Sequence, residues 1–281
     1  DPYGEAVLIA KTYEELLELV DEYVNSKPEK IYSKLGTEPA LRTHVLSLIA
    51  TDFAHTRVEL DSFIATTFFG FQHSEKAPLD PLISSIIGFL NREKMIEVRG
   101  GFISATPLGR LVSRLYIDPL SASVMIKALD KSAQPSLLAL LHTICSTPDM
   151  RRLYLRSKDY KWILEELADR EYELLSKKSS FDGEEYEWFL SEIKTALLLE
   201  AWISEEKEER ITEQFNVGPG DIRALSETAE WLMHSLAELS RHLHHPAAKQ
   251  AVELEQRIRY GAASELLPLI ALRDVGRVRA R

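Results

Sequence analysis

The sequence predicts a mainly α-helical protein, and three observations lead to that class. Glycine and proline number 12 each among 281 residues, so turn-forming residues are scarce and the elements are long. Apolar residues recur at the three- and four-residue spacing of amphipathic helices over most of the chain beyond residue 40. The stretch MIEVRGGFISAT, residues 95–106, instead alternates as a strand hairpin does. We therefore expect a winged-helix domain followed by a helical bundle.

The first residues do not fit either domain. Residues 5–10, EAVLIA, form a short apolar run that is typical of a buried strand. Thr12, with Glu15 three residues later, matches a capping box at the start of a helix over residues 13–23. One strand and one helix cannot form a domain, and the chain opens with Asp-Pro rather than Met. We expect residues 1–27 to be the end of a domain that lies upstream in a longer protein.

Residues 28–118 have the element order of a winged-helix domain. Three helical runs, ALRTHVLSLIATDFA, VELDSFIATTFFGF and PLISSIIGFLNREK, precede the hairpin stretch. Gly100 and Gly101 supply the positive φ angles of a tight hairpin turn. Thr106 and Pro107 are then the N-cap and first-turn proline of another helix. The alternative is a helical domain with an incidental hairpin.

Residues 119–264 show helical periodicity alone and predict a bundle. Breaks fall at Thr147-Pro148-Asp149, Asp182-Gly183 and Gly218-Pro219-Gly220. The expected helices cover residues 120–129, 135–145, 159–176, 184–203, 206–215, 221–243 and 247–260. Residues 265–281 follow as a short apolar helix and a basic end.

Composition excludes several function classes. The net charge of −10 argues against a broad basic surface that coats nucleic acid. Apolar runs fall short of the roughly 18 residues of a membrane span, and the first residues lack a secretory leader pattern, so we expect a cytoplasmic protein with no membrane partner. The single Cys145 excludes an intrachain disulfide, and within its apolar run it is expected to be a buried inert thiol rather than a nucleophile.

Motifs that carry catalysis are absent. The sequence has no phosphate loop, dinucleotide-binding glycine motif, zinc-protease motif or nucleophile elbow, so we expect no catalytic residue and no cofactor within these residues. His242, His244 and His245 suggest a metal site, but no acid or thiol lies near them in the sequence. Histidines at the end of a helix more often face the negative end of its dipole, so we expect no metal.

Residues 221–243 form the most informative helix. Apolar side chains repeat along one face, whereas Trp231 lies about 100° away from the centre of that face, on the polar flank. An aromatic residue there has three interpretations. It packs against another helix, it contacts a partner protein, or it offers its face to a nucleic-acid base. A stacked base contributes roughly 1–3 kcal/mol with little dependence on base identity.

Charge is distributed unevenly along the chain. Residues 182–210 hold ten carboxylates against three cations, whereas Arg273, Arg277, Arg279 and Arg281 face only Asp274. Gly276 would let the backbone turn toward a phosphate while the arginines add charge. Three arginines on three phosphates would give a log–log salt slope of roughly −2 to −3. The alternative is a frayed basic tail.

Several stretches together resemble one family, the archaeal Hjm-type superfamily 2 DNA helicases. DPYGEAVLI resembles the strand after the last arginine motif of the second RecA-like domain, and ATPLGRLVSRLYIDP resembles the helix that closes the winged-helix domain. YEWFLSEIKTALLLEAWI and GPGDIRALSETAEWL resemble the family's ratchet domain, and LRDVGRVRAR resembles its terminal helix–hairpin–helix. The five stretches occur in the family's order from end to end.

The resemblance implies a function and a set of DNA-binding residues. The family uses ATP to translocate 3′→5′ on single-stranded DNA and unwinds lagging strands at stalled forks. Its ratchet tryptophan corresponds to Trp231, while its partner arginine falls on Ala224, with Arg223 beside it. Its R-x-R-A-R pattern, which binds emerging DNA and restrains the motor, corresponds to Arg277, Arg279 and Arg281.

The resemblance also sets the expected domains and partners. They are the tail of the second RecA-like motor domain (1–27), a winged-helix domain (28–118), a ratchet domain (119–264) and the start of a helix–hairpin–helix (265–281). ATP and Mg²⁺ belong to the parent protein, since both ATPase motif sets lie upstream. The expected partners are single-stranded or forked DNA, the upstream motor domains, and replication or repair proteins.

Three hypotheses follow. The leading one is the DNA-gripping C-terminal portion of an ATP-dependent 3′→5′ DNA helicase in the repair of stalled forks, without ATP hydrolysis of its own. The second is a protein-interaction scaffold that docks a basic partner through the acidic residues 182–210. The third is a free-standing winged-helix regulator, which is disfavoured because residues 58–71 contain no Lys or Arg for a recognition helix.

Overall fold

The structure, a computed structural model, describes residues 3–73, 80–176, 183–272 and 275–281. Its helices and strands, in chain order, are α1 (Tyr13–Leu19), α2 (Glu38–Ala50), α3 (Arg57–Thr66), α4 (Phe68–His73), α5 (Asp80–Arg92), β1 (Ile96–Arg99), β2 (Phe102–Ala105), α6 (Pro107–Leu115), α7 (Pro119–Leu129), α8 (Leu137–Cys145), α9 (Asp159–Arg170), α10 (Glu184–Ile203), α11 (Glu208–Phe215), α12 (Pro219–His242), α13 (Ala248–Tyr260), α14 (Leu267–Ile270) and α15 (Arg277–Ala280). The mainly α-helical class is confirmed.

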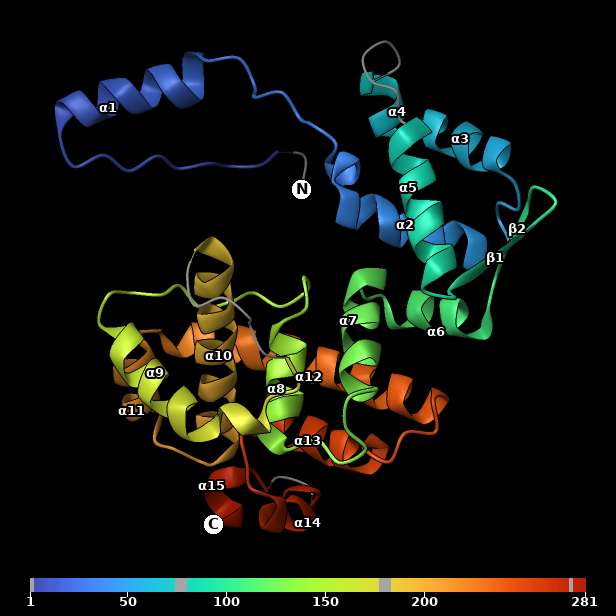
Figure 1. The fold of residues 1–281 in the computed structure, drawn as a ribbon. Helices are drawn as coiled ribbons and strands as arrows, with labels where there is room; N and C mark the ends of the chain where they lie inside the picture. Colours follow the sequence, from blue (N-terminus) through green and yellow to red (C-terminus); the bar gives the residue numbers. More distant parts are fainter. Residues whose placement is uncertain (1–2, 74–79, 177–182, 273–274) are drawn as a thin grey trace.

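Helices α2, α3 and α5, the β1–β2 hairpin and α6 form the predicted winged-helix arrangement, with the extra short helix α4 between α3 and α5 (Figure 1). Thr56 caps α3 in a capping box with Glu59. The hairpin is antiparallel and pairs Ile96 with Ala105. Gly100 and Gly101 have φ angles of 57° and 84°, so the turn uses the left-handed backbone that the glycine pair predicts.

Helix α6 begins directly after the hairpin and packs tightly against it. The Thr106 hydroxyl accepts a hydrogen bond from the amide of Gly109 at 3.1 Å, and Pro107 occupies the first turn, as predicted. A Cβ at Gly109 would lie 1.9 Å from the carbonyl oxygen of Met95. Glycine is therefore required where the helix backbone crosses the start of β1.

The helical bundle below the winged helix is built around α10 (Figure 1). Helices α8, α9, α11 and α13 contact α10, and α12 lies along α13 while touching α7 and α8. The observed α10 coincides with the predicted helix over residues 184–203. The buried apolar residues from α2 to α13 form one continuous cluster, so the winged helix and the bundle share a hydrophobic core.

The prediction of a strand over residues 5–10 is wrong for this structure. Those residues have no regular secondary structure, and Val7 and Ile9 are exposed. A strand needs a neighbour to pair with, and the described part of the chain offers it no sheet edge nearby (Figure 1). The helix that follows does form: Thr12 caps α1 by accepting from the Glu15 amide at 3.1 Å, and a π-helical turn extends it to Asn25.

Candidate nucleic-acid interface

The long helix α12 is the central element of the candidate interface. It begins at Pro219, where the carboxylate of Asp221 accepts a hydrogen bond from the amide of Gly218 at 2.9 Å. Its 24 residues extend about 36 Å at 1.5 Å per residue. The predicted apolar face is buried from Ile222 to Leu239, whereas Leu243 at its end is exposed, and the opposite flank is left for contacts outside the bundle.

Trp231 lies half-buried where α12 meets the winged-helix domain. Its indole Nε1–H donates a hydrogen bond to the carbonyl oxygen of Leu115, the last residue of α6, at 3.0 Å. The ring also packs against the shared core. The NH edge of the indole therefore takes part in helix packing, the first of its three interpretations, while the half-buried ring keeps an accessible part. Stacking of that ring on a base stays a prediction.

A buried ion pair fixes the same junction. Arg42 of α2 donates from Nε and Nη2 to the two carboxylate oxygens of Asp118, at 2.7 and 2.8 Å. Both side chains are almost fully buried, with 6% and 4% exposure. The hydrogen bond to Asp118 raises the pKa of Arg42, against the opposing effect of burial. Because Asp118 also caps α7, the winged helix and the bundle are joined by directional bonds as well as by apolar contact.

A second carboxylate, that of Asp149, is hydrogen-bonded to the main chain of Asp118. Asp149 accepts hydrogen bonds from the amide of Asp118 at 2.8 Å and from the hydroxyl of Ser121 at 2.6 Å. Burial raises the pKa of Asp149, and the two hydrogen bonds only partly oppose that effect. The junction is thus a polar network with little freedom to rearrange.

The other predicted residue on α12, Arg223, is exposed and pairs with Glu227 on its own helix at 2.9 Å. It lies eight residues before Trp231, about 12 Å along the helix axis. Ala224 is exposed and lines a groove whose opposite wall comes from a different part of the chain, residues 151–154. The structure thus keeps Arg223 and Trp231 on one helix without bringing their side chains together.

The predicted terminal arginines lie elsewhere. Helix α15 is at the end of the bundle farthest from the winged helix (Figure 1). Arg281 pairs with Glu205 at 3.1 Å and with Glu265 at 3.8 Å, and Arg279 is exposed. The side chain of Arg277 lies outside the described residues. The predicted DNA-binding residues therefore form two separate groups, one on α12 and one at the C-terminal end.

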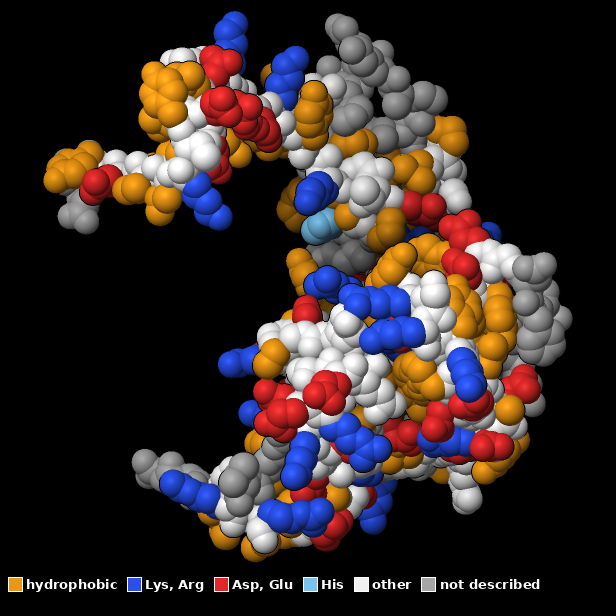
Figure 2. Space-filling model, turned by 90° about the vertical axis from the view of Figure 1, so that its left-hand side faces the viewer, with side chains coloured by type: hydrophobic (Ala, Val, Ile, Leu, Met, Phe, Trp, Pro, Cys, Tyr) orange, Lys and Arg blue, Asp and Glu red, His pale blue; other side chains and the backbone are white. Residues whose placement is uncertain are grey.

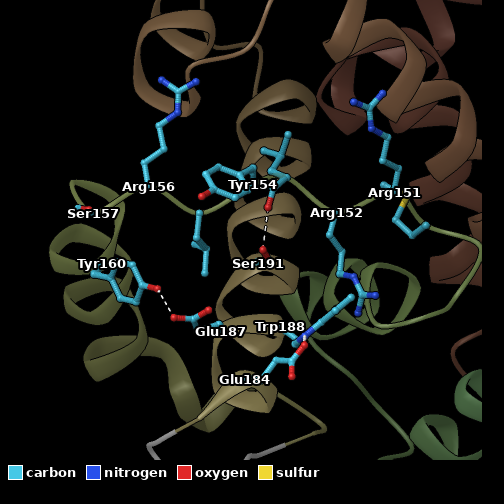
Figure 3. Close-up of a pocket in the computed structure, with 13 residues that line it drawn as sticks. Arg151, Arg152, Tyr154, Arg156, Ser157, Tyr160, Glu184, Glu187, Trp188 and Ser191 are labelled. Carbon is cyan, nitrogen blue, oxygen red and sulfur yellow. Dashed lines mark hydrogen bonds between the residues drawn. The ribbon is translucent and has the colours of Figure 1, made fainter.

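Residues 151–158, RRLYLRSK, are a candidate binding element that the sequence analysis missed. They are called the basic segment below, since four of the eight are Arg or Lys and none is acidic. Figure 3 shows the segment crossing α10. The side chains of Arg151 and Arg156 extend from one side of the segment, and that of Arg152 extends from the other side toward Trp188. The signal that could have found it is this local charge run with a tyrosine at its centre.

Lys and Arg side chains also gather at mid-height on one face of the molecule (Figure 2). They lie where the winged helix meets the bundle, beside the hollow beneath the N-terminal segment. The overall net charge of −10 conceals this local concentration. Local potential, rather than net charge, decides whether a phosphate backbone is attracted to a surface.

The acidic residues 182–210 are partly neutralised within the fold. Arg170 pairs with Glu200 at 2.7 Å, Arg152 pairs with Glu192 at 3.1 Å, and Arg281 pairs with Glu205 at 3.1 Å. The hydrogen bonds that Arg170 donates to Glu200, and then those to Glu173, raise the pKa of Arg170. These carboxylates serve internal contacts, which leaves the scaffold hypothesis with a smaller acidic face than the sequence indicates.

The histidines near the end of α12 and the single cysteine were the remaining candidates for metal or thiol chemistry. Among the residues that the structure describes, no group of three or more His, Cys, Asp or Glu side chains is arranged to hold a metal ion. His242 ends α12 and is exposed, and His245 Nδ1 accepts a hydrogen bond from the amide of Ala247 at 3.2 Å. Cys145 is fully buried as predicted, and desolvation raises the pKa of its thiol far from the reactive range.

A search of the described helices for membrane spans finds none with the length and apolar character required to cross a bilayer. The candidate site is a surface with aromatic and cationic side chains, on a body in which the winged helix and the bundle share one core.

Comparisons with known proteins define the class to which this arrangement belongs. Residues 4–97 match the sequence model of a helix-turn-helix domain, and residues 138–261 match that described as "Archaeal helicase, domain 4". The bundle is thus similar to a domain of archaeal helicases, and it follows a region that is similar to helix-turn-helix domains.

The particular family follows from whole-chain matches to proteins named ATP-dependent DNA helicase Hel308. The chain is 52% identical to the one from Methanocella arvoryzae over its whole length and covers 38% of that protein. It is 38% identical to the Pyrococcus horikoshii protein and 36% identical to the Thermococcus kodakarensis protein, covering 39% and 25% of them. The chain belongs to the Hel308 helicase family and spans well under half the length of these relatives.

Proposed function

We propose that this chain is the DNA-handling C-terminal portion of an ATP-dependent 3′→5′ DNA helicase that acts in the repair of stalled replication forks. The observation that carries the proposal is the combination of whole-chain identity to Hel308 helicases with a half-buried Trp231 on a long helix at a rigid domain junction. The chain grips single-stranded DNA and does not hydrolyse ATP by itself, since it carries no phosphate loop.

In this proposal, ATP and Mg²⁺ act in RecA-like motor domains upstream of these residues. The winged helix transmits motor movement to the bundle as one body, because the Arg42–Asp118 pair and the shared core resist relative motion. The strand passes along α12, where Trp231 stacks on a base and Arg223 contacts a phosphate. The terminal arginines Arg277, Arg279 and Arg281 contact the strand as it leaves. A DNA substrate implies a cytoplasmic location in an archaeal cell, alongside replication or repair proteins.

The test separates stacking from packing at Trp231. Trp231→Leu and Trp231→Phe both lose the hydrogen bond to Leu115, but only the Phe variant keeps an aromatic face. We expect Trp231→Leu to bind a fluorescent oligothymidylate about 5- to 100-fold more weakly than Trp231→Phe at low salt, as loss of one stacked base predicts. Equal affinities for the two variants would show that Trp231 serves packing alone.

Trp202 provides a matched control within the same chain. It is also half-buried, and its Nε1–H donates to the carbonyl oxygen of Ile258 at 2.8 Å, away from α12's junction with α6. Trp202→Leu and Trp202→Phe should bind the oligonucleotide equally well. If the Trp202 pair also differs in affinity, the effect arises from loss of bundle integrity rather than from a stacking site.

A further inference from the structure

The basic segment, residues 151–158, is the strongest feature of the surface that the proposed function leaves without a role. It has four cationic residues and no acid, and it connects α8 to α9 by crossing the middle of α10 (Figure 3). Residues 151–156 have no helical or strand hydrogen bonding. Their main-chain groups therefore need partners elsewhere.

Helix α10 supplies those partners through a row of polar side chains. The Leu153 amide donates to Thr195 Oγ1 at 2.9 Å, and Ser191 Oγ donates to the Leu153 carbonyl at 2.7 Å. Lys194 Nζ donates to the Tyr154 carbonyl at 2.9 Å. The main chain of the segment is thus bonded inward, and the geometry in which it displays its side chains is set before any ligand arrives.

A buried ion pair completes this anchor. Lys194 Nζ lies 2.6 Å from Asp159 Oδ2, with side-chain exposures of 2% and 0%. The same oxygen accepts a hydrogen bond from the Arg156 amide at 2.9 Å. A buried ion pair often adds little net stability, because desolvation offsets the attraction. Here Lys194 also donates to the Tyr154 carbonyl and Asp159 also accepts from the Arg156 amide, so the pair defines the shape of that segment.

The side chains that the segment displays are those that bind single-stranded nucleic acid. Tyr154 is 82% exposed, and Arg151 and Arg156 on either side of it are exposed as well. Neither of these two guanidinium groups pairs with a carboxylate among the residues that the structure describes. Arg152 differs, because it stacks over Trp188 at 4.2 Å and pairs with Glu192.

Two grooves meet at the segment. One, of about 860 Å³, lies between the segment and the first half of α10 and includes Trp188. The other, of about 270 Å³, lies between the segment and the first half of α12 and includes Ala224 and Thr228. Arg151 and Tyr154 line both grooves. A strand that lies along the first half of α12 is therefore next to these two side chains.

We propose that the basic segment is a second contact for single-stranded nucleic acid, in which Tyr154 stacks on a base and Arg151 and Arg156 contact phosphates on either side. That its ligand is a single strand of nucleic acid rests on the proposed function, but the side chains of this second contact do not include Trp231. The two arginines are five residues apart, a separation of at most about 17 Å in extended chain, so one strand can contact both. Aromatic stacking between cations is the usual platform for sequence-independent binding of single strands.

The carboxylates near the site favour one path for the strand. Glu184 and Glu187 line the large groove, where Trp188 Nε1 lies 3.4 Å from Glu184 and Tyr160 donates a hydrogen bond to Glu187. Asp221 lines the small groove and caps α12. A phosphate backbone therefore runs over the crest formed by Arg151, Tyr154 and Arg156 rather than along the groove floors.

The experiment measures binding of the full chain to a fluorescein-labelled oligothymidylate of about 20 nucleotides. We expect Tyr154→Ala to weaken binding about 5- to 100-fold and Tyr154→Trp to restore it, because only stacking is common to Tyr and Trp. The matched control is Tyr172→Ala, which removes a tyrosine that is 78% exposed at the end of α9. It should leave the affinity unchanged.

Salt dependence tests the arginines separately. The double variant Arg151→Ala/Arg156→Ala should make the log–log salt slope less negative by about 1.4, since each phosphate contact on a single strand contributes about 0.7. The control pair Arg92→Ala/Arg99→Ala, exposed on the winged-helix domain, should leave the slope unchanged.

The outcomes distinguish the two proposals. If the wild-type chain does not bind the oligonucleotide, both are overturned. If Trp231→Leu weakens binding and Tyr154→Ala does not, the second contact is wrong and the proposed function stands. If polyglutamate displaces the oligonucleotide and Tyr154→Ala weakens both ligands equally, the segment is an acidic-peptide site and the proposal fails. If Tyr154→Ala weakens binding of the oligonucleotide but not of polyglutamate, the proposed second contact is supported.

Discussion

The basic segment and the C-terminal residues 273–281 are both rich in arginine, but their surroundings in the fold differ. The basic segment has a main chain bonded to α10, and Arg151 and Arg156 are exposed without carboxylate partners among the described residues. At the C-terminal end, Arg281 reaches back to Glu205 and Glu265. The comparison teaches that the availability of a cation depends on which carboxylates the fold places beside it, and not on the local density of arginine.

The same comparison extends to how each region is held in place. The basic segment depends on the buried Lys194–Asp159 pair, whereas Arg281 takes part in partly exposed pairs. Buried and exposed ion pairs differ strongly in the consequences of removing one partner.

Lys194→Met should lower the free energy of unfolding by about 3–5 kcal/mol, because it leaves the Asp159 carboxylate buried without its cation. The variant should also lose oligonucleotide affinity, since the Tyr154 carbonyl loses its donor. Chemical denaturation measures the first effect and fluorescence anisotropy the second. A wild-type unfolding free energy in this variant would mean that the pair does not anchor the segment.

Two further variants sharpen this result. Lys127→Met removes an exposed lysine that lies 2.8 Å from Glu93, and it should cost no more than about 1 kcal/mol. The double variant Lys194→Met/Asp159→Leu should recover part of the lost stability, because no unpaired charge then remains buried. Equal losses in Lys194→Met and Lys127→Met would remove the distinction between the two kinds of pair.

Acid should weaken the anchor of the basic segment by protonating Asp159. Burial acts to raise the pKa of Asp159, but the hydrogen bond from Lys194 and the other donors outweigh it and lower the pKa. A carboxyl group whose pKa is lowered in the folded state stabilises the protein at every pH above its unfolded-state pKa, which is about 3.9 for Asp. That stability is lost as the pH falls through the folded-state pKa. Unfolding free energies below pH 4 should fall more steeply in the wild type than in Lys194→Met/Asp159→Leu. Parallel curves would contradict this assignment.

Glu205→Gln should release Arg281 and raise oligonucleotide affinity slightly. The Gln Oε1 can still accept the Ala263 amide hydrogen bond that Glu205 accepts at 2.9 Å, so the local fold is kept. We expect at most about a fivefold gain at low salt, because an ion pair of this kind contributes no more than about 1 kcal/mol. The salt slope should become more negative by about 0.7 if Arg281 then contacts one phosphate. Reduced affinity would show that the pairing positions Arg281 for DNA rather than withholding it.

Glu265→Gln should have the smallest effect. The pair with Arg281 spans 3.8 Å between partly exposed groups, so its removal should change the unfolding free energy by less than about 0.5 kcal/mol. Oligonucleotide affinity should stay within experimental error of the wild type. A clear gain in affinity here, with none in Glu205→Gln, would make Glu265 the carboxylate that restrains the terminal arginines.

Much of the fold could be predicted from local patterns. Apolar spacing gave the extent of α10, and Gly100 and Gly101 gave the hairpin turn. Thr106 and Pro107 located the start of α6. These features succeed because a cap or a tight turn depends on side chains within three or four residues of one another. The strand expected over residues 5–10 failed because a strand depends on a partner that its own residues cannot supply.

The candidate site was less accessible to sequence reasoning. The position of Trp231 on the flank of α12 was predicted, but its hydrogen bond to Leu115 was not, because that contact depends on how two domains dock. The role of Lys194 was also missed. The residues three and four positions away from it in α10 are not acidic and give no local sign of a buried partner, and Asp159 reaches it only when α9 packs on α10.

By itself the sequence determined the helical class, the hairpin, most helix limits and the family resemblance, since periodicity and capping act over a few residues. Only the tertiary structure decided which charges are available for a ligand. Arg151 and Arg281 each lie in a run of arginines, yet the fold exposes the first beside a tyrosine and brings Glu205 to the second. Electrostatic pairing depends on distance in space, and segments far apart along the chain set that distance.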